Sequence, residues 1–180
     1  APAALTNAIA ANTDNTVRIT VTTATPAALL FSATATNGIR LFTTDPKNNA
    51  ITAGKSTVTG TAGTTYIYAV PTLVGAGTIT VTSGGLTQVF TLTGELAATP
   101  KAQLVTLTAG TNANGAATYT VKTTDVFGNA VAADVNVTIS GNGYLSNGFK
   151  NMTVTTLATD GSNSFDVNSN GTSATGITAT

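Results

Sequence analysis

The chain has 180 residues, 7 Lys+Arg, 7 Asp+Glu, no His, no Cys, no Trp and a formal net charge of zero. Without His or Cys it has no Ser-His-Asp triad, no Cys-His dyad and no metal site of the His/Cys type. Neutrality and the lack of a basic patch argue against nucleic-acid binding. We therefore expect a structural module rather than an enzyme, with no catalytic, cofactor-binding or metal-binding residues.

The composition is typical of an exported surface protein. Only 8% of the residues are charged and 41 are Thr, whereas charged residues make up about 25% of an ordinary globular domain. No charged residue lies between Lys55 and Glu95, but Thr, Gly and Pro interrupt this stretch throughout. A membrane span needs about 20 mainly apolar residues, so we expect an extracellular, cell-surface protein without a membrane span.

In chain order, the first segment is the Ala-rich stretch 2–11, which fits a short helix or an irregular first strand equally well. From Val17 onward the apolar residues recur with a period of two, which places one kind of side chain on each face of a strand. This alternation predicts strands around residues 17–21, 78–82, 89–93, 104–108, 119–121, 135–139 and 152–155. Thr at the intervening positions suits the solvent-facing side of a sheet.

Turn signals separate these strands at short intervals. They are Asn37-Gly38, Asp45-Pro46, Gly84-Gly85, Asn114-Gly115, Gly128-Asn129, Asn142-Gly143 and Asp160-Gly161. Strands and turns that alternate every 8–12 residues or so are typical of a β-sandwich. The sequence therefore predicts an all-β fold built from immunoglobulin-like (Ig-like) sandwiches.

The chain also repeats itself weakly, with a period of about 100 residues. Segment 19–23 matches 119–123, 37–39 matches 142–144, 57–59 matches 153–155, and 76–82 matches 174–180. This order predicts two tandem sandwiches, residues 1–97 and residues 98–180. Residues 97–100, Ala-Ala-Thr-Pro, have the composition of a short linker.

The two copies differ at their ends. In the first copy, Thr82 is followed by a turn and a further strand at residues 87–93, whereas the second copy stops at the position that matches Thr82. We therefore expect the second domain to lack its last strand, either because the chain is a fragment of a longer protein or because another chain supplies the strand. A sandwich without a terminal strand has an open edge that invites pairing.

One motif in the second copy is specific enough to suggest a family. A strand is followed by Asp125, Gly128, Asn129 and Val131 in the pattern Asp-x-x-Gly-Asn-x-Val, and then by a second strand. This pattern resembles the bacterial Ig-like repeats of invasin and intimin type. Gly128 and Asn129 tolerate positive φ, and Asp125 can accept backbone hydrogen bonds within the turn. The first copy has Thr25-Pro26-Ala27-Ala28 at this place, so the resemblance covers only the second domain.

The resemblance implies a structural role and no catalytic residues. Such repeats form tandem stalks in surface adhesins and in surface-layer (S-layer) proteins, and the Thr-rich, Cys-free composition is more like the latter. We expect spacer modules that self-assemble with neighbouring copies into an S-layer or filament. A cell-wall or surface glycan remains a further potential partner. The alternatives are the stalk of an adhesin and an Ig-like decoration or tail domain of a phage particle.

Calcium is the one cofactor that the sequence leaves open. Asp166, Asn168 and Asn170 are spaced like the first oxygen ligands of a calcium loop, and Gly171 stands at the sixth position. The closing acid is absent, because Ile177 occupies its place. A polar turn between two strands is the competing interpretation, with Asp160 as a residue that could extend a calcium site.

Three other patterns have both a functional and an ordinary interpretation. Glycosylation sequons begin at Asn136, Asn151 and Asn170, but such triplets arise by chance in a chain rich in Asn and Thr. Tyr66 and Tyr68 would share one face of a strand, which favours cross-strand packing over a carbohydrate platform. Lysines such as Lys55, Lys122 and Lys150 could form an isopeptide bond with Asn, although solvated lysines are the simpler expectation.

Overall fold

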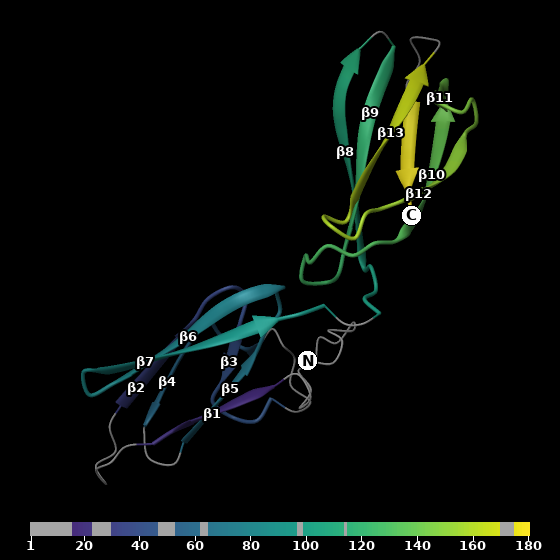
Figure 1. The fold of residues 1–180 in the computed structure, drawn as a ribbon. Coiled ribbons are helices and arrows are strands. Elements are labelled where there is room, and N and C mark those ends of the chain that lie inside the picture. Colours follow the sequence, from purple (N-terminus) through teal and green to yellow (C-terminus); the bar gives the residue numbers. More distant parts are fainter. Residues whose placement is uncertain are drawn as a thin grey trace. The chain divides into compact units, whose positions relative to one another are not determined.

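The computed structural model describes residues 16–22, 30–46, 53–61, 65–96, 99–113, 115–169 and 175–180. The chain divides into two compact units, Ala1–Pro100 and Lys101–Thr180, whereas the sequence placed the boundary between residues 97 and 98. Figure 1 shows the strands of each unit. The Ala-rich stretch 2–11 and the segment Thr25-Pro26-Ala27-Ala28 lie outside the described residues.

The first unit is a sandwich of two antiparallel sheets, of order β1-β5-β3 and β4-β2-β6-β7. Its strands are β1 (Val17–Val21), β2 (Leu30–Ala35), β3 (Arg40–Phe42), β4 (Thr57–Thr61), β5 (Thr65–Val70), β6 (Gly75–Ser83) and β7 (Leu86–Gly94). The β6–β7 hairpin turns at Gly84 and Gly85, which both have positive φ. That geometry explains why two successive glycines occupy this turn.

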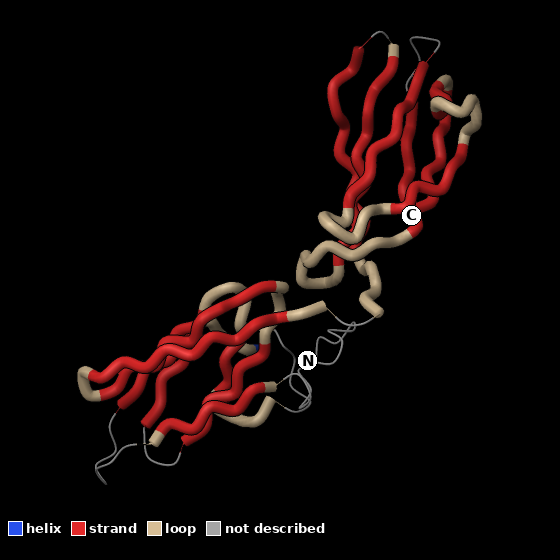
Figure 2. Tube along the Cα trace, viewed as in Figure 1, coloured by secondary structure: helices blue, strands red, loops and turns tan. Residues whose placement is uncertain are grey.

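The second unit repeats this plan, with sheets of order β12-β10-β14 and β11-β13-β9-β8. Its strands are β8 (Leu104–Ala113), β9 (Ala116–Thr124), β10 (Asp134–Gly141), β11 (Gly143–Leu145), β12 (Asn151–Thr155), β13 (Ser162–Ser169) and β14 (Thr175–Ala179). The described part of the chain consists of strands, turns and loops (Figure 2). It contains no helix that is long and apolar enough to cross a membrane.

Each unit has its own apolar core between its two sheets. In β10, for example, Val135, Val137 and Ile139 are buried while the residues between them are exposed. The first core is made of residues from β1, β2, β4, β5 and β6 together with Ile39 and Leu41. The expected all-β sandwich fold is therefore confirmed, and the alternation of Val or Ile with Thr is its cause.

The repeated segments occupy the same places in both units. In the first unit β2 pairs with β4 and β6, and β5 pairs with β1 and β3. In the second unit β10 pairs with β12 and β14, and β13 pairs with β9 and β11. The strands β1 to β6 thus correspond to β9 to β14, and the weak sequence repeat reflects one topology used twice.

The two units differ at the edges of their sheets. In the first unit β7 pairs with β6 along its whole length. In the second unit β14, the counterpart of β6, pairs with β10 on one side, and among the described residues no strand lies on its other side. Among the described residues, β7 therefore has no counterpart in the second unit.

One expectation for the second unit is wrong. The polar segment from Asp166 was expected to form a turn, but residues 166–169 belong to β13, and residues 170–174 lie outside the described part. Phe165 and Val167 point into the core, so Asp166 and Asn168 take the outward positions of the same strand. Burying two apolar residues at alternate positions of a strand outweighs the preference of the Asp, Asn and Ser residues between them for a turn.

The core of the second unit gives a direct stability prediction. Leu145 is fully buried on β11, whereas Leu157 is 54% exposed in the loop after β12. Leu145→Ala should lower the free energy of unfolding by about 2–5 kcal/mol, because it leaves a cavity. Leu157→Ala should change it by less than about 1 kcal/mol. Urea unfolding followed by tyrosine fluorescence measures both, and equal losses would contradict the assigned core.

Candidate functional site

The segment 125–131 forms a tight turn whose centre is a buried carboxylate. Asp125 Oδ1 accepts hydrogen bonds from the backbone N–H groups of Phe127 (2.8 Å) and Asn129 (2.9 Å), and Oδ2 accepts one from Asn129 Nδ2 (2.8 Å). Gly128 has a φ of +92°, which favours glycine. Asp125 and Asn129 are both buried. The motif therefore folds the crossover from β9 to β10.

Two buried threonines, Thr123 and Thr156, hold the same crossover in place through their hydroxyl groups. Thr123 Oγ1 lies 2.6 Å from Thr156 Oγ1 and 2.6 Å from the carbonyl oxygen of Val131. Thr156 Oγ1 in turn accepts a hydrogen bond from the backbone N–H of Ala133 at 2.9 Å. These hydroxyls connect the end of β9 to the loops that lead into β10 and β13. The sequence analysis missed them, although Thr123 stands two residues after buried Val121, at an inward position of its strand.

The residues considered for calcium make ordinary side-chain contacts. Asp166 Oδ1 accepts a hydrogen bond of 2.7 Å from Thr118 Oγ1 on the neighbouring strand β9. Asp160 Oδ1 accepts one of 2.9 Å from the backbone N–H of Ser162, at the turn before β13. Ser164 Oγ lies 2.9 Å from Thr120 Oγ1. In the described ranges no three His, Cys, Asp or Glu residues gather in a way that could hold a metal ion.

The described sequons and lysines make ordinary contacts, and the sequon that begins at Asn170 lies outside the described residues. Asn136 lies exposed on β10 and its Oδ1 accepts a hydrogen bond of 3.2 Å from Thr153 Oγ1, while Asn151 is exposed at the start of β12. Lys150 Nζ donates to the carbonyl oxygens of Gly141 and Gly143. That contact stabilises the tight connection between β10 and β11.

Tyr66 and Tyr68 form a small aromatic cluster on the outward face of β5. Their ring centroids are 6.4 Å apart, and the Arg18 guanidinium lies 4.6 Å from the centre of the Tyr66 ring. Ile67 and Ala69, which alternate with the tyrosines, are fully buried in the core. The two tyrosines therefore contact each other along β5, and Tyr66 also contacts Arg18 on the neighbouring strand β1. Their half-exposed rings and the guanidinium present an aromatic and cationic surface.

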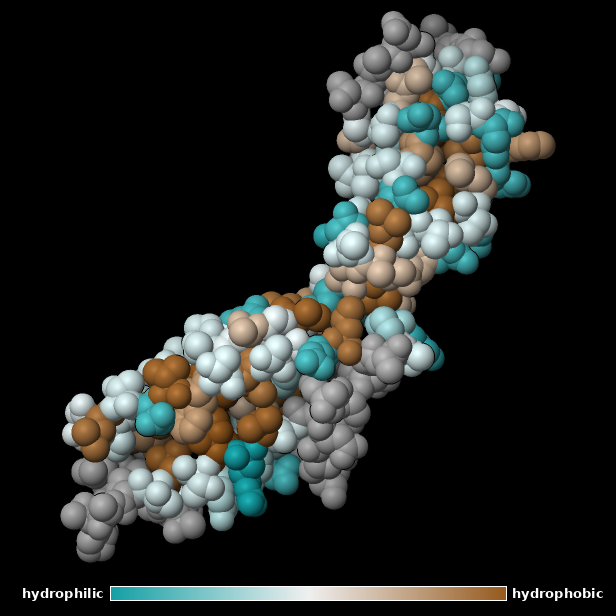
Figure 3. Space-filling view, viewed as in Figure 1, coloured by the Kyte–Doolittle hydropathy of each residue, from teal (hydrophilic) through white to brown (hydrophobic). Residues whose placement is uncertain are grey.

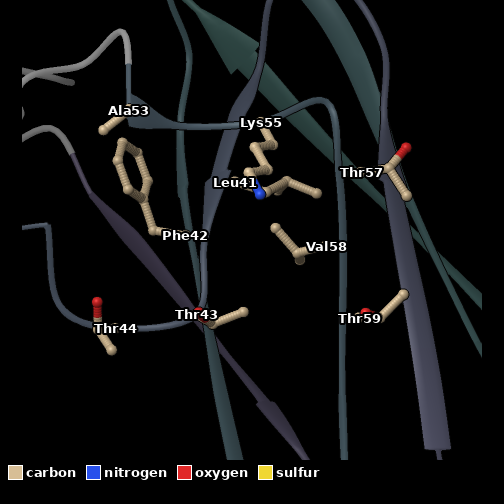
Figure 4. A pocket seen from close by; sticks show the side chains of 9 residues that line it. All are labelled: Leu41, Phe42, Thr43, Thr44, Ala53, Lys55, Thr57, Val58 and Thr59. Atoms are coloured by element: carbon tan, nitrogen blue, oxygen red, sulfur yellow. The ribbon is translucent and has the colours of Figure 1, made fainter.

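A hollow of about 430 Å³ opens beside β3 and β4 (Figure 4). Its lining is mostly threonine and apolar side chains: Leu41, Phe42, Thr43, Thr44, Ala53, Lys55, Thr57, Val58 and Thr59. Lys55 is the one ionisable residue among the described residues of that lining. These described residues therefore include no pair of a base with an acid or a nucleophile.

The most distinctive surface lies on the side of the second unit where β7 has no counterpart. Val105, Leu107 and Ala109 of β8 pair with β9 on the face that carries buried Val121 and Thr123. In spite of that inward position, Val105 is 40% exposed and Ala109 is exposed. The inner face of β8 is thus only partly covered by the opposite sheet.

The strand β14 lies on the same side of the second unit as the partly covered inner face of β8. The N–H of Thr180 donates to the carbonyl of Asn136, and the N–H of Asn136 donates back to Thr180. Because bonding partners alternate along an antiparallel strand, the N–H groups of Thr178 and Thr180 point to β10, whereas those of Ile177 and Ala179 point to the outer edge. Ile177 and Ala179 also pack against the core, where they are only half-buried. We call β14 and the inner face of β8 together the open edge.

The outer surface of both units is polar but weakly charged. On the face visible in Figure 3, residues of near-neutral hydropathy predominate, with small apolar patches between them. Exposed threonines also pair with each other, as in the contact of 3.1 Å between Thr36 Oγ1 and Thr78 Oγ1. Such a surface offers hydrogen bonds without charge repulsion.

Comparison with known proteins yields only distant structural likenesses. No protein-family model matches the chain, and no curated protein matches it. A glycosyl hydrolase family 2 member from Bacteroides cellulosilyticus is similar with a TM-score of 0.37 and 18% identity, over 93% of this chain and 27% of that chain. A β-glucuronidase from Parabacteroides merdae gives a TM-score of 0.30 and 11% identity, over 85% of this chain and 20% of that chain. The chain thus spans less than a third of the length of either protein.

The carboxylate of the turn should be important for stability. Asp125→Ala removes the acceptor of three hydrogen bonds in a buried place. It should lower the free energy of unfolding by about 1–3 kcal/mol, because the donors lose their partner. The control is Asp134→Ala, which removes an exposed acid with one side-chain contact to Thr155 and should cost about 0.5 kcal/mol or less. Urea unfolding compares them, and an equal loss would contradict the structural role of Asp125.

Asp160 gives a pH-dependent prediction. Hydrogen bonds from the side chain and the backbone N–H of Ser162 lower the pKa of Asp160 below its ordinary value of 3.8. The stabilisation is therefore present above about pH 4 and is lost as the pH falls through the lowered pKa. The melting temperature of the wild type should exceed that of Asp160→Asn at pH 7, and the difference should shrink toward pH 2. A difference that grows on acidification would contradict this assignment.

Proposed function

We propose that this chain is a structural, non-enzymatic protein of the cell surface, whose Ig-like units act as spacers and self-assemble into an S-layer or filament. The observation that carries the proposal is the open edge of the second unit. It combines the free side of β14 with half-buried apolar residues on both adjoining sheets. Unpaired backbone groups on an edge strand can pair with a strand of another chain, which is the kind of contact that the proposed assembly needs.

The surface chemistry supports assembly rather than steering of a charged ligand. The net charge is zero and 8% of the residues are charged, so little electrostatic repulsion opposes contact between copies. Threonine hydroxyls on the outward faces supply further hydrogen bonds. The assembly needs no cofactor in this proposal, and calcium enters only as a condition of the experiment.

The Asp125 turn supports the relationship to bacterial Ig-like repeats. Its residues fold the β9–β10 crossover, which is a structural role. We accordingly propose that the chain acts outside the cell as a member of that group of surface modules.

An adhesin stalk is the second candidate function. The cluster of Tyr66, Tyr68 and Arg18 favours it, because half-exposed aromatic rings beside a guanidinium can stack against and hydrogen-bond a cell-wall or surface glycan. In that case the units would remain separate rods, and sugar binding would depend on the two tyrosines. A phage decoration domain has no comparable support from a particular surface.

Electron microscopy of the purified chain at high concentration, with calcium and with chelator, tests the self-assembly. We expect ordered sheets or filaments. Thr178→Lys, which places a charge on the free edge of β14, should abolish them, because lysine on an edge strand opposes further pairing. Thr153→Lys on β12, at the other edge of the same sheet, is the matched control and should leave them intact. Separate particles of the wild type under all conditions would refute self-assembly and favour the stalk.

A further inference from the structure

The outward face of the sheet β1-β5-β3 gathers arginine and tyrosine side chains. Residues that lie opposite each other in neighbouring strands share a face of the sheet. By this register, the exposed and half-exposed residues on the outward face are Arg18, Thr20, Tyr66, Tyr68 and Arg40. They include both arginines of the chain. The three strands contain no Asp or Glu, so this face is cationic.

These side chains follow one another along β5. The Arg18 guanidinium lies 4.6 Å from the centre of the Tyr66 ring, and the ring centroids of Tyr66 and Tyr68 are 6.4 Å apart. Arg40 lies opposite Val70, which is the next outward position of β5 after Tyr68. Because β1 and β3 flank β5, the backbones that carry the two arginines are about 10 Å apart. The face therefore presents two rings between two separate cations.

The contact with Tyr66 still leaves Arg18 able to bind an anion. A guanidinium above an aromatic ring is attracted by the negative face of that ring. Its N–H donors form a planar fork that matches a carboxylate with two parallel hydrogen bonds. Both Arg18 and Arg40 are exposed. The two arginines can therefore each receive a carboxylate from a ligand that lies along the tyrosines.

The second unit shows that the fold does not require these side chains. In its equivalent sheet, Thr118 lies opposite Asp166, and Thr120 lies opposite Ser164. Since segment 19–23 corresponds to 119–123, these four residues take the places of Arg18, Tyr68, Thr20 and Tyr66. There the short polar side chains bond to each other, at 2.7 Å from Thr118 to Asp166 and at 2.9 Å between Thr120 and Ser164. The arginines and tyrosines of the first unit are thus not dictated by the topology.

We propose that this face of the first unit binds an acidic glycan, a polysaccharide whose sugar rings carry carboxylate groups. The apolar faces of successive sugar rings would lie on Tyr66 and Tyr68, and their carboxylates would accept hydrogen bonds from Arg18 and Arg40. The inference rests on the second candidate function, for which it names the class of ligand. It does not depend on self-assembly.

Charge and ring chemistry favour this ligand over other classes. A neutral glycan would lie on the tyrosines and leave both guanidinium groups without an anion. An acidic peptide would neutralise the arginines but would bring no sugar ring to the tyrosines. Tight binding of nucleic acid generally requires many phosphate contacts, whereas this face has two cations. An acidic glycan uses both the rings and the cations.

Calorimetric titration of the full chain with an oligogalacturonate tests the proposal. The methyl ester of the same oligosaccharide keeps the sugar rings without the negative charge, and poly-glutamate keeps the carboxylates without the rings. We expect binding of the oligogalacturonate to be at least about tenfold tighter than binding of either control, because each control lacks one kind of contact. Oligothymidylate, a single-stranded nucleic acid, should also bind more weakly than the oligogalacturonate.

Variants locate the site. Arg18→Gln/Arg40→Gln should weaken binding of the oligogalacturonate by at least about tenfold, because both charge-assisted contacts are lost. The matched control Lys101→Gln/Lys122→Gln removes the same charge from two exposed positions of the second unit and should leave the affinity unchanged. Tyr66→Ser introduces the residue of the equivalent place in the second unit and should also weaken binding. Tyr66→Phe keeps the ring and should preserve most of it.

Four results would each overturn the proposal: no binding of the oligogalacturonate, equal or tighter binding of any of the other three ligands, an equal loss in the lysine control, or no loss in the arginine variant. Electron microscopy of the arginine variant separates this inference from self-assembly, because that variant should assemble like the wild type. A protein that assembles without binding oligogalacturonate refutes the acidic-glycan site alone. A protein that binds it as separate particles refutes self-assembly alone.

Discussion

Both units depend on the burial of one thin layer of Val, Ile, Leu and Phe between two sheets. Few large side chains are available, since the chain has six Phe, four Tyr and no Trp. Many strands therefore contribute through alternation, with an apolar residue inward and most often a Thr, Ser or Asn outward. The stability of such a core depends on its coverage, because any inner face without an opposite strand leaves apolar area in water.

Because each core depends on being covered, the two units differ in their surface chemistry mainly at the edges of their sheets. The first unit has β7 beside β6, while the second has half-buried Ile177 and Ala179 on β14 and a half-covered inner face on β8. The buried hydrogen-bond network around Asp125, Thr123 and Thr156 holds the crossover at the other end of the second unit. The turn stabilises the unit itself, whereas the open edge is the surface through which we propose that copies join. Together these features fit the building-block role that we propose for the chain.

Much of the fold could be predicted from the sequence, because the apolar period of two and the paired glycine and asparagine turns are local signals. All the strands expected from alternation, such as residues 17–21 and 135–139, lie within strands of the structure. β13 was not recognised, since only Phe165 and Val167 point inward among Asp, Asn and Ser. β3 and β11 are three residues long and carry too few positions to show a period.

The candidate site was harder to predict, for physical reasons. The Asp125 turn follows from the conformational preferences of Gly128 and Asn129, which are local. The Thr123–Thr156 pair joins residues far apart in sequence, and Thr is so frequent that an inward position does not stand out. The missing counterpart of β7 was visible in the repeat, but the exposure of Val105 on the other sheet required the three-dimensional arrangement.

The central claim, that the open edge is paired in the assembled protein, can be tested most directly by hydrogen exchange at single amides of β14. In dispersed protein, the N–H of Thr178, which points to β10, should exchange slowly, and those of Ile177 and Ala179 should exchange fast. In the assembly all three should exchange slowly. Fast exchange at Ile177 and Ala179 in ordered assemblies would contradict the account, because it would place the contacts between copies elsewhere.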